Sequence, residues 1–261
     1  KQPRRDPVDI VVGRLRRQHG GDEQLPGIAV VEGGPDFGIP LLQPAQDDPG
    51  PATILGGGGH GWDATPPPSS LPGMDLRTAV ATMGRVEGDL LMVDEFLNHR
   101  VDVAVMAAVG RDLADRMRAA SPDLLLTAEA SGVPPSLACA MELDLPMVYA
   151  KKYLGPGDRY SFFREVTSPT KGTEYRVEIA RRVLPPGQRV AIIDDFLAGG
   201  RTAEALGEIV EEAGSEVAGF AFVIEKAFAG GRDRLEGHGW SVHSLLRIAS
   251  LEGGAPRLLD D

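Results

Sequence analysis

The segment that most constrains the fold spans residues 190–203 and reads VAIIDDFLAGGRTA. Its first four residues are apolar and predict a buried strand, and two carboxylates, Asp194 and Asp195, follow at the carboxyl end of that strand. A turn of small residues comes next, and an apolar pattern with helical spacing runs through residues 205–210. Strand, turn and helix together predict a βα unit, which is typical of an α/β fold with a mostly parallel sheet.

The same segment predicts a ligand that carries both phosphate and hydroxyl groups. Ligands of open α/β sheets bind outside the carboxyl ends of the strands, where the two acids and the turn are expected. A helix N-terminus preceded by glycines offers free backbone N–H groups and a positive dipole end to a phosphate. Carboxylates accept hydrogen bonds from sugar hydroxyls, so a ribose 5-phosphate fits this arrangement. The alternative is that one of the two acids only caps the turn that follows.

From Met74 onward, the patterns of strands and helices alternate. Apolar residues at helical spacing predict helices over residues 76–86, 102–119 and 131–143. The polar residues 154–172 predict a long loop, and loops of such length in a compact domain are usually functional or disordered. This alternation predicts helices on both faces of the sheet. Strands are predicted over residues 90–93, 124–126, 147–150, 175–179 (an edge strand), 190–193, 217–224 and 241–245.

Residues 1–73 differ in composition from the rest of the chain. They contain 12 prolines and 14 glycines, which is more than a third of the segment. A proline and glycine content above roughly a quarter, without a repeat, is typical of low-complexity segments. We therefore predict a largely irregular tail over residues 1–73, with Met74 as a candidate natural start, and a single domain over residues 74–261.

Bulk properties exclude several classes of protein. A formal net charge of −11 argues against a sequence-independent nucleic-acid binder, which needs a basic surface. The single cysteine, Cys139, rules out an internal disulfide, and its apolar helical surroundings predict a buried small hydrophobe. The chain has no secretory signal pattern and no apolar run approaching about 18 residues. These features predict a cytoplasmic protein with neither nucleic-acid nor membrane partners.

Further motifs occur in a fixed order around the acid pair. They are VDEFLNH at residues 93–99, EASG at 129–132, YAKK at 149–152, VIEKAF at 223–228 and GRD at 231–233. With residues 190–203, they resemble the type I phosphoribosyltransferases, and among these the bacterial xanthine phosphoribosyltransferases. The resemblance covers about residues 74–259. One departure lies in the turn, where the usual Thr-Gly-Gly-Thr is replaced by Gly-Gly-Arg-Thr at residues 199–202.

The resemblance implies a type I phosphoribosyltransferase fold with a small hood, a homodimer, and phosphoribosyl pyrophosphate and a free purine base as substrates. Magnesium is implied through the substrate, without a cage of protein ligands. Asp194 and Asp195 are implied to bracket the ribose hydroxyls and Lys151 to bind pyrophosphate, with Lys152 as a solvated neighbour. Arg201 either reaches the phosphate or points to solvent. The residues implied to bind phosphoribosyl pyrophosphate are Ser131, Gly132, Ala198, Gly199, Gly200, Arg201, Thr202, Ser168 and Lys171.

The resemblance also implies a pocket for the base. Asn98 offers a donor and an acceptor, and Lys226 offers donors to an exocyclic oxygen. Phe228 either stacks on the purine or packs in the core, while Arg232 either lines the mouth of the pocket or caps a helix. Ala198 stands where some relatives have an aspartate that acts on N7 of the purine. The residues implied to bind the base are Leu97, Asn98, Lys226 and Phe228, with Glu225 nearby.

The activity implied is the transfer of 5-phosphoribosyl from phosphoribosyl pyrophosphate to N9 of xanthine. Its products are xanthosine monophosphate and pyrophosphate, which is a reaction of purine salvage. One alternative is the same chemistry on guanine, hypoxanthine or adenine. A second alternative is a non-catalytic regulator that senses phosphoribosyl pyrophosphate, although residues 1–73 lack the helical periodicity of a DNA-binding winged helix.

Overall fold

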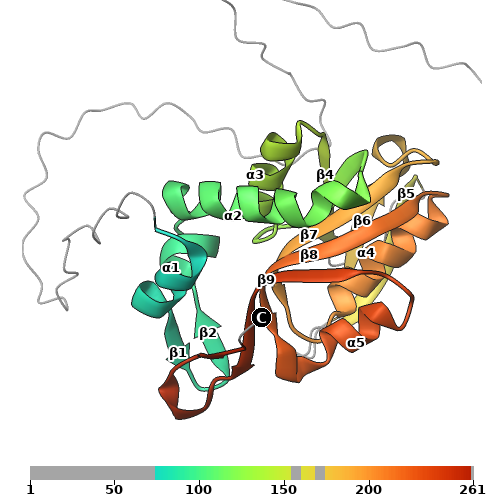
Figure 1. The fold of residues 1–261 in the computed structure, drawn as a ribbon. Helices are drawn as coiled ribbons and strands as arrows, with labels where there is room; N and C mark the ends of the chain where they lie inside the picture. The colour runs from blue at the N-terminus through green and yellow to red at the C-terminus, as the bar shows by residue number, and fades with distance from the viewer. Residues whose placement is uncertain (1–73, 154–159, 168–173, 260–261) are drawn as a thin grey trace, which may run out of the picture. The chain divides into compact units, whose positions relative to one another are not determined.

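A mixed sheet of eight strands forms the centre of the fold (Figure 1). The structure is a computed structural model that describes residues 74–153, 160–167 and 174–259. The strand order is β10-β9-β8-β7-β3-β4-β6-β5. The neighbouring strands β9, β8, β7, β3 and β4 are parallel, whereas β6, β5 and β10 are antiparallel to their neighbours. The strands are β3 (Leu124–Ala128), β4 (Met147–Tyr153), β5 (Ser161–Thr167), β6 (Glu174–Ala180), β7 (Arg189–Leu197), β8 (Glu216–Lys226), β9 (Val242–Ser250) and β10 (Arg257–Leu258).

Helices cover both faces of the sheet, as the alternating pattern predicts. In Figure 1, α2 (Val103–Met117) and α3 (Val133–Leu143) lie over one face, and α4 (Arg201–Glu212) and α5 (Gly231–Glu236) lie over the other. Asp102 begins α2 because its side chain accepts hydrogen bonds from the backbone N–H groups of Ala104 and Val105, which have no partner inside the helix. The predicted helices at 102–119 and 131–143 are therefore confirmed, with their ends moved by one or two residues.

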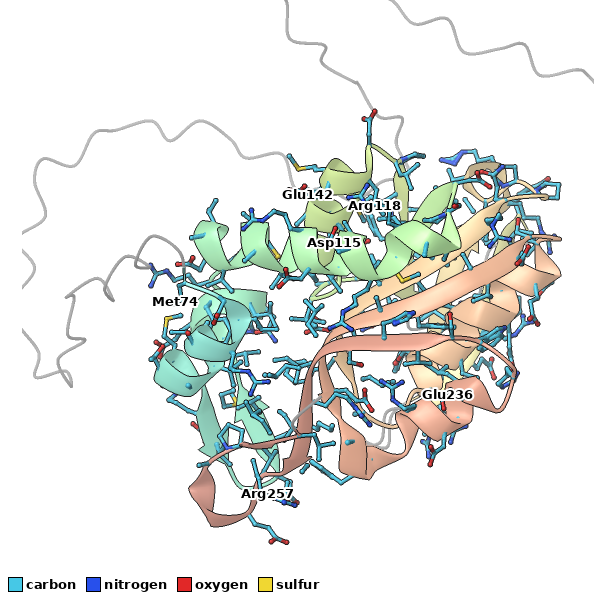
Figure 2. The ribbon with its side chains drawn as sticks, viewed as in Figure 1. Met74, Asp115, Arg118, Glu142, Glu236 and Arg257 are labelled. Carbon is cyan, nitrogen blue, oxygen red and sulfur yellow. The ribbon has the colours of Figure 1, made fainter. Side chains whose placement is uncertain are left out.

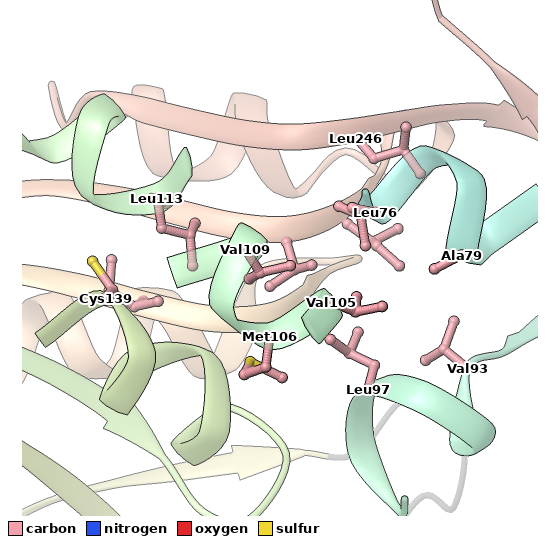
Figure 3. Packing of buried hydrophobic residues seen from close by; sticks show 14 of the residues in the cluster. Leu76, Ala79, Val93, Leu97, Val105, Met106, Val109, Leu113, Cys139 and Leu246 are labelled. Carbon is pink, nitrogen blue, oxygen red and sulfur yellow. The ribbon is translucent and has the colours of Figure 1, made fainter. Parts of the chain in front are cut away.

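Each face of the sheet has its own hydrophobic core. On the side of α2 and α3, Val105, Val109 and Leu113 are fully buried and pack with Cys139 of α3 (Figure 3). On the other side, α4 buries Leu206 and Ile209 against β7 and β8. Burial raises the pKa of the Cys139 thiol to about 12. This confirms the prediction that Cys139 packs as a small hydrophobe.

The predictions for the two strands beyond β4, which are β6 and β5, were wrong in two respects. The predicted edge strand at 175–179 is β6, and it lies between β4 and β5. The true edge strand, β5, lies inside the segment that was predicted to be a loop. Its polar residues misled the prediction because an edge strand with one face in solvent buries only part of its side chains, here Phe162 and Val166 among its apolar residues.

A hood of short elements lies beyond the ends of the central strands. It consists of α1 (Leu76–Met83), the hairpin β1 (Arg85–Glu87) and β2 (Leu90–Met92), and the π-helical turn η1 (Asp94–Asn98). The predicted helix at 76–86 ends early, because Gly84 terminates it and the chain enters β1. Leu76 and Ala79 anchor the hood on the core shared with α2 (Figure 3).

No helix within the described residues is long and apolar enough to cross a membrane. Residues 1–73, predicted to form an irregular tail, lie outside the described residues.

Candidate active site

The candidate site lies where the strand order reverses. β3 and β7 are parallel neighbours, but the chain continues from β3 to β4 on one side and from β7 to β8 on the other. Connections that leave in opposite directions open a crevice at the carboxyl ends of such strands, and this is where ligands of α/β sheets bind. Two turns follow these strands here, residues 129–132 after β3 and residues 198–200 after β7.

The two acids lie within the last residues of β7, which runs on to Leu197. Asp195 is buried and Asp194 is half-buried, and the backbone N–H of Asp195 donates to Oδ1 of Asp194 over 2.9 Å. Burial raises the pKa of Asp194, the neighbouring Asp195 carboxylate raises it further, and the ammonium group of Lys152 partly opposes both. Two carboxylates crowded in this way favour a cation or hydroxyl donors between them.

The turn after β3 packs directly against this acid pair. Gly132 leaves no room for a side chain, because a Cβ atom there would overlap Oδ1 of Asp194 and Oγ1 of Thr127. The Thr127 hydroxyl is fully buried and has no hydrogen-bond partner among the described residues. The peptide bond between Glu129 and Ala130 is cis. Ser131 and Gly132, predicted to bind substrate, therefore lie beside the acids.

The N-terminus of α4 is open, as the glycine turn predicts. Gly200 precedes the helix with φ of +75°, a left-handed conformation that favours glycine, and no side chain caps the helix. The first intrahelical bond in this turn joins the Glu204 N–H to the Gly200 carbonyl. The N–H groups of the first helical residues have no partner within the helix, and such groups, together with the helix dipole, are suited to binding an anion.

Helix α5 contacts the turn at residues 198–202, here called the phosphate turn. The Arg234 Nε donates to the Gly199 carbonyl over 2.8 Å, while its Nη1 binds Glu204 of α4 over 2.9 Å. Gly231 packs against the Ala198 carbonyl so closely that a Cβ atom would overlap it. The resemblance marked Gly231 as part of a motif but assigned it no role, and nothing in the sequence pointed to Arg234.

The two residues after the glycines reach the strands β5 and β6. Arg201 is exposed, and its Nη1 donates to the Thr167 carbonyl over 3.3 Å. The Thr202 hydroxyl lies 2.7 Å from the hydroxyl of Tyr175 on β6. Sequence reasoning missed Tyr175, because this contact joins residues 27 positions apart in different elements.

Of the two lysines on β4, Lys152 lies nearer the acids. Adjacent strand residues point to opposite faces, and Lys152 shares the face of the buried Ala150, on the side of α4. Its Nζ lies 5.6 Å from the centre of the Tyr175 ring, and its charge acts on Asp194. Its backbone N–H donates to the Glu129 carboxylate over 2.8 Å, which ties β4 to the turn after β3. The structure does not bring Lys151 toward the acids in this way.

On the side of the base, Leu97 was predicted to line the pocket and this prediction was wrong. Its side chain is fully buried in the core with Val93 and Val105 (Figure 3). Asn98, the last residue of η1, is half-buried. Lys226, at the end of β8, donates from Nζ to the Asp89 carbonyl of the hood over 3.1 Å, and burial lowers its pKa.

Phe228 is not a core residue, because 54% of its surface is exposed. It borders a cavity of about 530 Å³ between the tip of the β1–β2 hairpin and the residues around the end of β9. An exposed aromatic ring beside a cavity is available to stack on a planar ligand. Residues that line this cavity are Gly88, Asp89, Phe228, Ala249, Ser250, Leu251, Glu252, Gly253 and Gly254.

Glu225 and Arg232 form a structural ion-pair network instead of a base-binding surface. Glu225 is 1% exposed and accepts two hydrogen bonds from Arg232, over 3.0 and 2.6 Å, and one from Ser244. Arg232 also binds Glu236, which Figure 2 labels on α5. Despite its burial, the pKa of Glu225 is lowered by these partners and by Arg247. The network fixes the end of β8, which carries Lys226.

Two predicted site residues, Ser168 and Lys171, lie outside the described residues. Within residues 74–153, 160–167 and 174–259, no group of three or more His, Cys, Asp or Glu side chains is arranged to hold a metal ion by itself. The crowded acid pair nevertheless suits a magnesium ion that a substrate carries, because magnesium prefers oxygen ligands and keeps many of its own.

Comparison with known proteins identifies the family. Residues 94–242 match the phosphoribosyl transferase domain, so the chain belongs to this family. Among its relatives, the xanthine phosphoribosyltransferase of Chloroflexus aurantiacus is 46% identical over 171 residues, which cover 66% of this chain and 81% of the relative. The xanthine phosphoribosyltransferase of an Exiguobacterium species is 42% identical over 186 residues, covering 68% of this chain and 93% of the relative.

Solved structures support the same fold. The adenine phosphoribosyltransferase of Rhodothermus marinus matches with a TM-score of 0.55 and 27% identity, covering 66% of this chain and 99% of that one. The enzyme of Giardia lamblia, solved with 9-deazaadenine, matches with a TM-score of 0.57 at 19% identity and covers 67% of this chain and 98% of that one. The predicted type I phosphoribosyltransferase fold is therefore confirmed.

Proposed function

We propose that this phosphoribosyltransferase transfers 5-phosphoribosyl from phosphoribosyl pyrophosphate to N9 of xanthine. The bond between ribose C1 and the pyrophosphate oxygen breaks, the bond between C1 and N9 forms, and the N9 proton leaves to solvent. The products are xanthosine monophosphate and pyrophosphate, and the reaction serves purine salvage. The relatives with 46% and 42% identity, both xanthine phosphoribosyltransferases, support this choice of base.

One observation carries the proposal. The acid pair of β7, the uncapped N-terminus of α4 and the turn at residues 129–132 converge at the point where the strand order reverses. The uncapped N–H groups suit the 5-phosphate, and the carboxylates suit the ribose hydroxyls between the two turns. The turn at residues 129–132 packs against Asp194, and we assign the backbone amides of residues 131 and 132 to the pyrophosphate.

The residues then have distinct roles. Asp194 and Asp195 accept hydrogen bonds from the ribose hydroxyls and hold the sugar while positive charge develops at C1. Magnesium bound to the substrate would neutralise charge on the pyrophosphate. Lys152, whose charge already acts on the acid pair, is the lysine that we assign to pyrophosphate, in place of Lys151. Ser168 and Lys171 remain predictions for the same group.

For the base, we propose Asn98, Lys226 and Phe228. Phe228 is exposed enough to stack, and Lys226 has donors beyond the one that binds the Asp89 carbonyl. Ala198 provides no carboxylate for N7, so proton transfer from the base relies on solvent or on a base that ionises readily, as xanthine does. A homodimer, a cytoplasmic location and the magnesium requirement rest on the family resemblance.

The first test is product formation by the wild type and by Asp195→Asn. With phosphoribosyl pyrophosphate, magnesium and xanthine, the wild type should form xanthosine monophosphate, detected by mass spectrometry. Asp195→Asn should lower kcat/KM roughly ten- to a hundredfold, because a charged acceptor is lost from the reacting sugar. Asp112→Asn, on the exposed surface of α2, is the matched control and should keep full activity.

The outcomes separate the remaining alternatives. Turnover with another purine and none with xanthine would mean that the protein transfers phosphoribosyl to a different base. Binding of phosphoribosyl pyrophosphate without turnover on any purine would favour a regulator. Unchanged kinetics in Asp195→Asn would mean that this acid is structural.

A further inference from the structure

Tyr175 of β6 holds the second residue of the proposed phosphate-binding helix. Its phenol oxygen lies 2.7 Å from the Thr202 hydroxyl, and both residues are half-buried. Thr202 follows Arg201 at the open start of α4, among the N–H groups that have no partner within the helix. Thr202 carries the one side-chain hydroxyl of the phosphate turn. A contact with Tyr175 therefore sets the direction of this hydroxyl beside the N–H groups.

The chemistry of the two hydroxyls decides which one donates. A phenol, with an ordinary pKa of about 10, is a better donor than an aliphatic hydroxyl. The Lys152 ammonium lies 5.6 Å from the centre of the Tyr175 ring, and a cation over the ring withdraws electron density from it. The geometry allows either hydroxyl to donate, and these two effects favour the phenol of Tyr175 as the donor. The proton of Thr202 is then left to donate to an acceptor outside the pair, and the chain of two hydroxyls strengthens that bond.

The support for Tyr175 is rigid. Strand β6 is paired with β5 through seven registered residue pairs, in which Tyr175 faces Val166, and its other edge is paired with β4. Val177 and Ile179, on the same face as Tyr175, are buried in the core beneath α4. The phenol is thus held by the sheet, while the hydroxyl that it contacts belongs to the helix.

We propose that Tyr175 is a positioning residue for the 5-phosphate: it donates to Thr202 and so orients the Thr202 hydroxyl proton toward the phosphate. This inference rests on the proposed function. Because the interaction is made with a part of the substrate that does not react, it contributes to binding in the ground state and the transition state alike. Its loss should raise KM and leave kcat nearly unchanged.

The experiment is a double-mutant cycle on the full chain. Tyr175→Phe removes only the phenol oxygen, Thr202→Ala removes its partner, and Thr202→Ser keeps a hydroxyl. Tyr175→Phe should raise KM for phosphoribosyl pyrophosphate roughly three- to tenfold with kcat within about twofold. Thr202→Ser, which keeps a hydroxyl, should raise KM less than Thr202→Ala, and the double variant should be no worse than Thr202→Ala. Tyr153→Phe, an exposed tyrosine on β4, is the control and should change neither constant.

Binding of ribose 5-phosphate, measured by calorimetry, separates this inference from the proposed function. A three- to tenfold weaker Kd in Tyr175→Phe supports the positioning role even if no purine is turned over. Effects of the two single variants that multiply in the double variant would overturn the proposal, because the two hydroxyls would then act independently. It would also be overturned if Tyr175→Phe lowered Tm and left both KM and Kd unchanged.

Discussion

Asp194 carries its charge at a cost to the stability of the fold. Burial and the Asp195 carboxylate raise its pKa, so the folded protein binds the proton of Asp194 more tightly than the unfolded chain does. The tighter proton binding by Asp194 contributes to the free energy of unfolding. This contribution is fully present below the pKa of an aspartate in the unfolded chain, about 3.9, and is lost as the pH rises through the raised pKa of the folded protein. A substrate that brings hydroxyl donors and a cation relieves the same repulsion, so instability in the free protein contributes to binding.

This predicts that Asp194→Asn stabilises the free protein at neutral pH while weakening its activity. Asparagine keeps an acceptor for the Asp195 N–H and removes the like charge. Tm should be higher than that of the wild type at pH 7.5, by roughly 2–4 °C for each kcal/mol relieved, and the difference should vanish near pH 3. Melting curves of both proteins at the two pH values measure it, with Asp112→Asn as control. An equal or lower Tm at pH 7.5 would contradict the electrostatic account.

At this scale, the sequence predicts which residues form the candidate site but not all of the residues that contact them. The acids and the glycine turn follow one another in the chain, so their pattern is readable. Tyr175 and Arg234 reach the phosphate turn from β6 and α5, and a contact between distant elements leaves no local pattern. Leu97 shows the opposite error, because a residue next to Asn98 in a motif was taken for a ligand contact when it is core.

The phosphate turn owes its shape to the elements around it. Helix α5 holds the Gly199 carbonyl through Arg234 and packs Gly231 beneath Ala198, while β6 holds Thr202. The hydrogen bond from Arg234 to the Gly199 carbonyl fixes the position of that peptide group. An open helix N-terminus that must bind an anion gains affinity when its donors are preorganised in this way.

Replacing Arg234 by methionine should therefore loosen the turn without touching the ligand. The side-chain stem is kept and two hydrogen bonds are lost, those to Gly199 and Glu204. We expect KM for phosphoribosyl pyrophosphate to rise roughly two- to tenfold, with kcat changed less. Steady-state kinetics test this, with Arg111→Met on the exposed surface of α2 as the matched control. If KM stays at the wild-type value, α5 does not position the turn.

The elements themselves were predictable where they are long and buried. Strands β3, β7 and β8 and helices α2 and α3 show continuous apolar runs or helical spacing, and these patterns predicted them. Strand β5 was missed because residues 154–172 are mostly polar, and β1 because a three-residue strand carries no period to detect. Strand β2 falls within the predicted strand at 90–93. Strands β1 and β5 depend on what they pack against, so the sequence alone could not place them.

In the whole domain, the sheet and the hood support two different parts of the proposed site. The proposed phosphoribosyl site lies on the sheet, after the neighbouring strands β3 and β7. The proposed base site lies at the contact between the hood and the end of β8, where Lys226 binds the Asp89 carbonyl and Phe228 borders a cavity. In this proposal, the sheet binds the phosphoribosyl group and the hood determines the choice of base.

The central claim is that this chain uses phosphoribosyl pyrophosphate to convert an oxopurine, with xanthine preferred. The most direct test is kcat/KM for xanthine, guanine, hypoxanthine and adenine under the same conditions. Adenine presents an amino donor where Lys226 needs an acceptor, and a buried mismatch of this kind costs about 1–3 kcal/mol, or roughly ten- to a hundredfold. We predict the highest kcat/KM for xanthine, lower values for guanine and hypoxanthine, and the lowest for adenine. A preference for adenine would contradict the account of the pocket, and no turnover of any base would contradict the proposed activity.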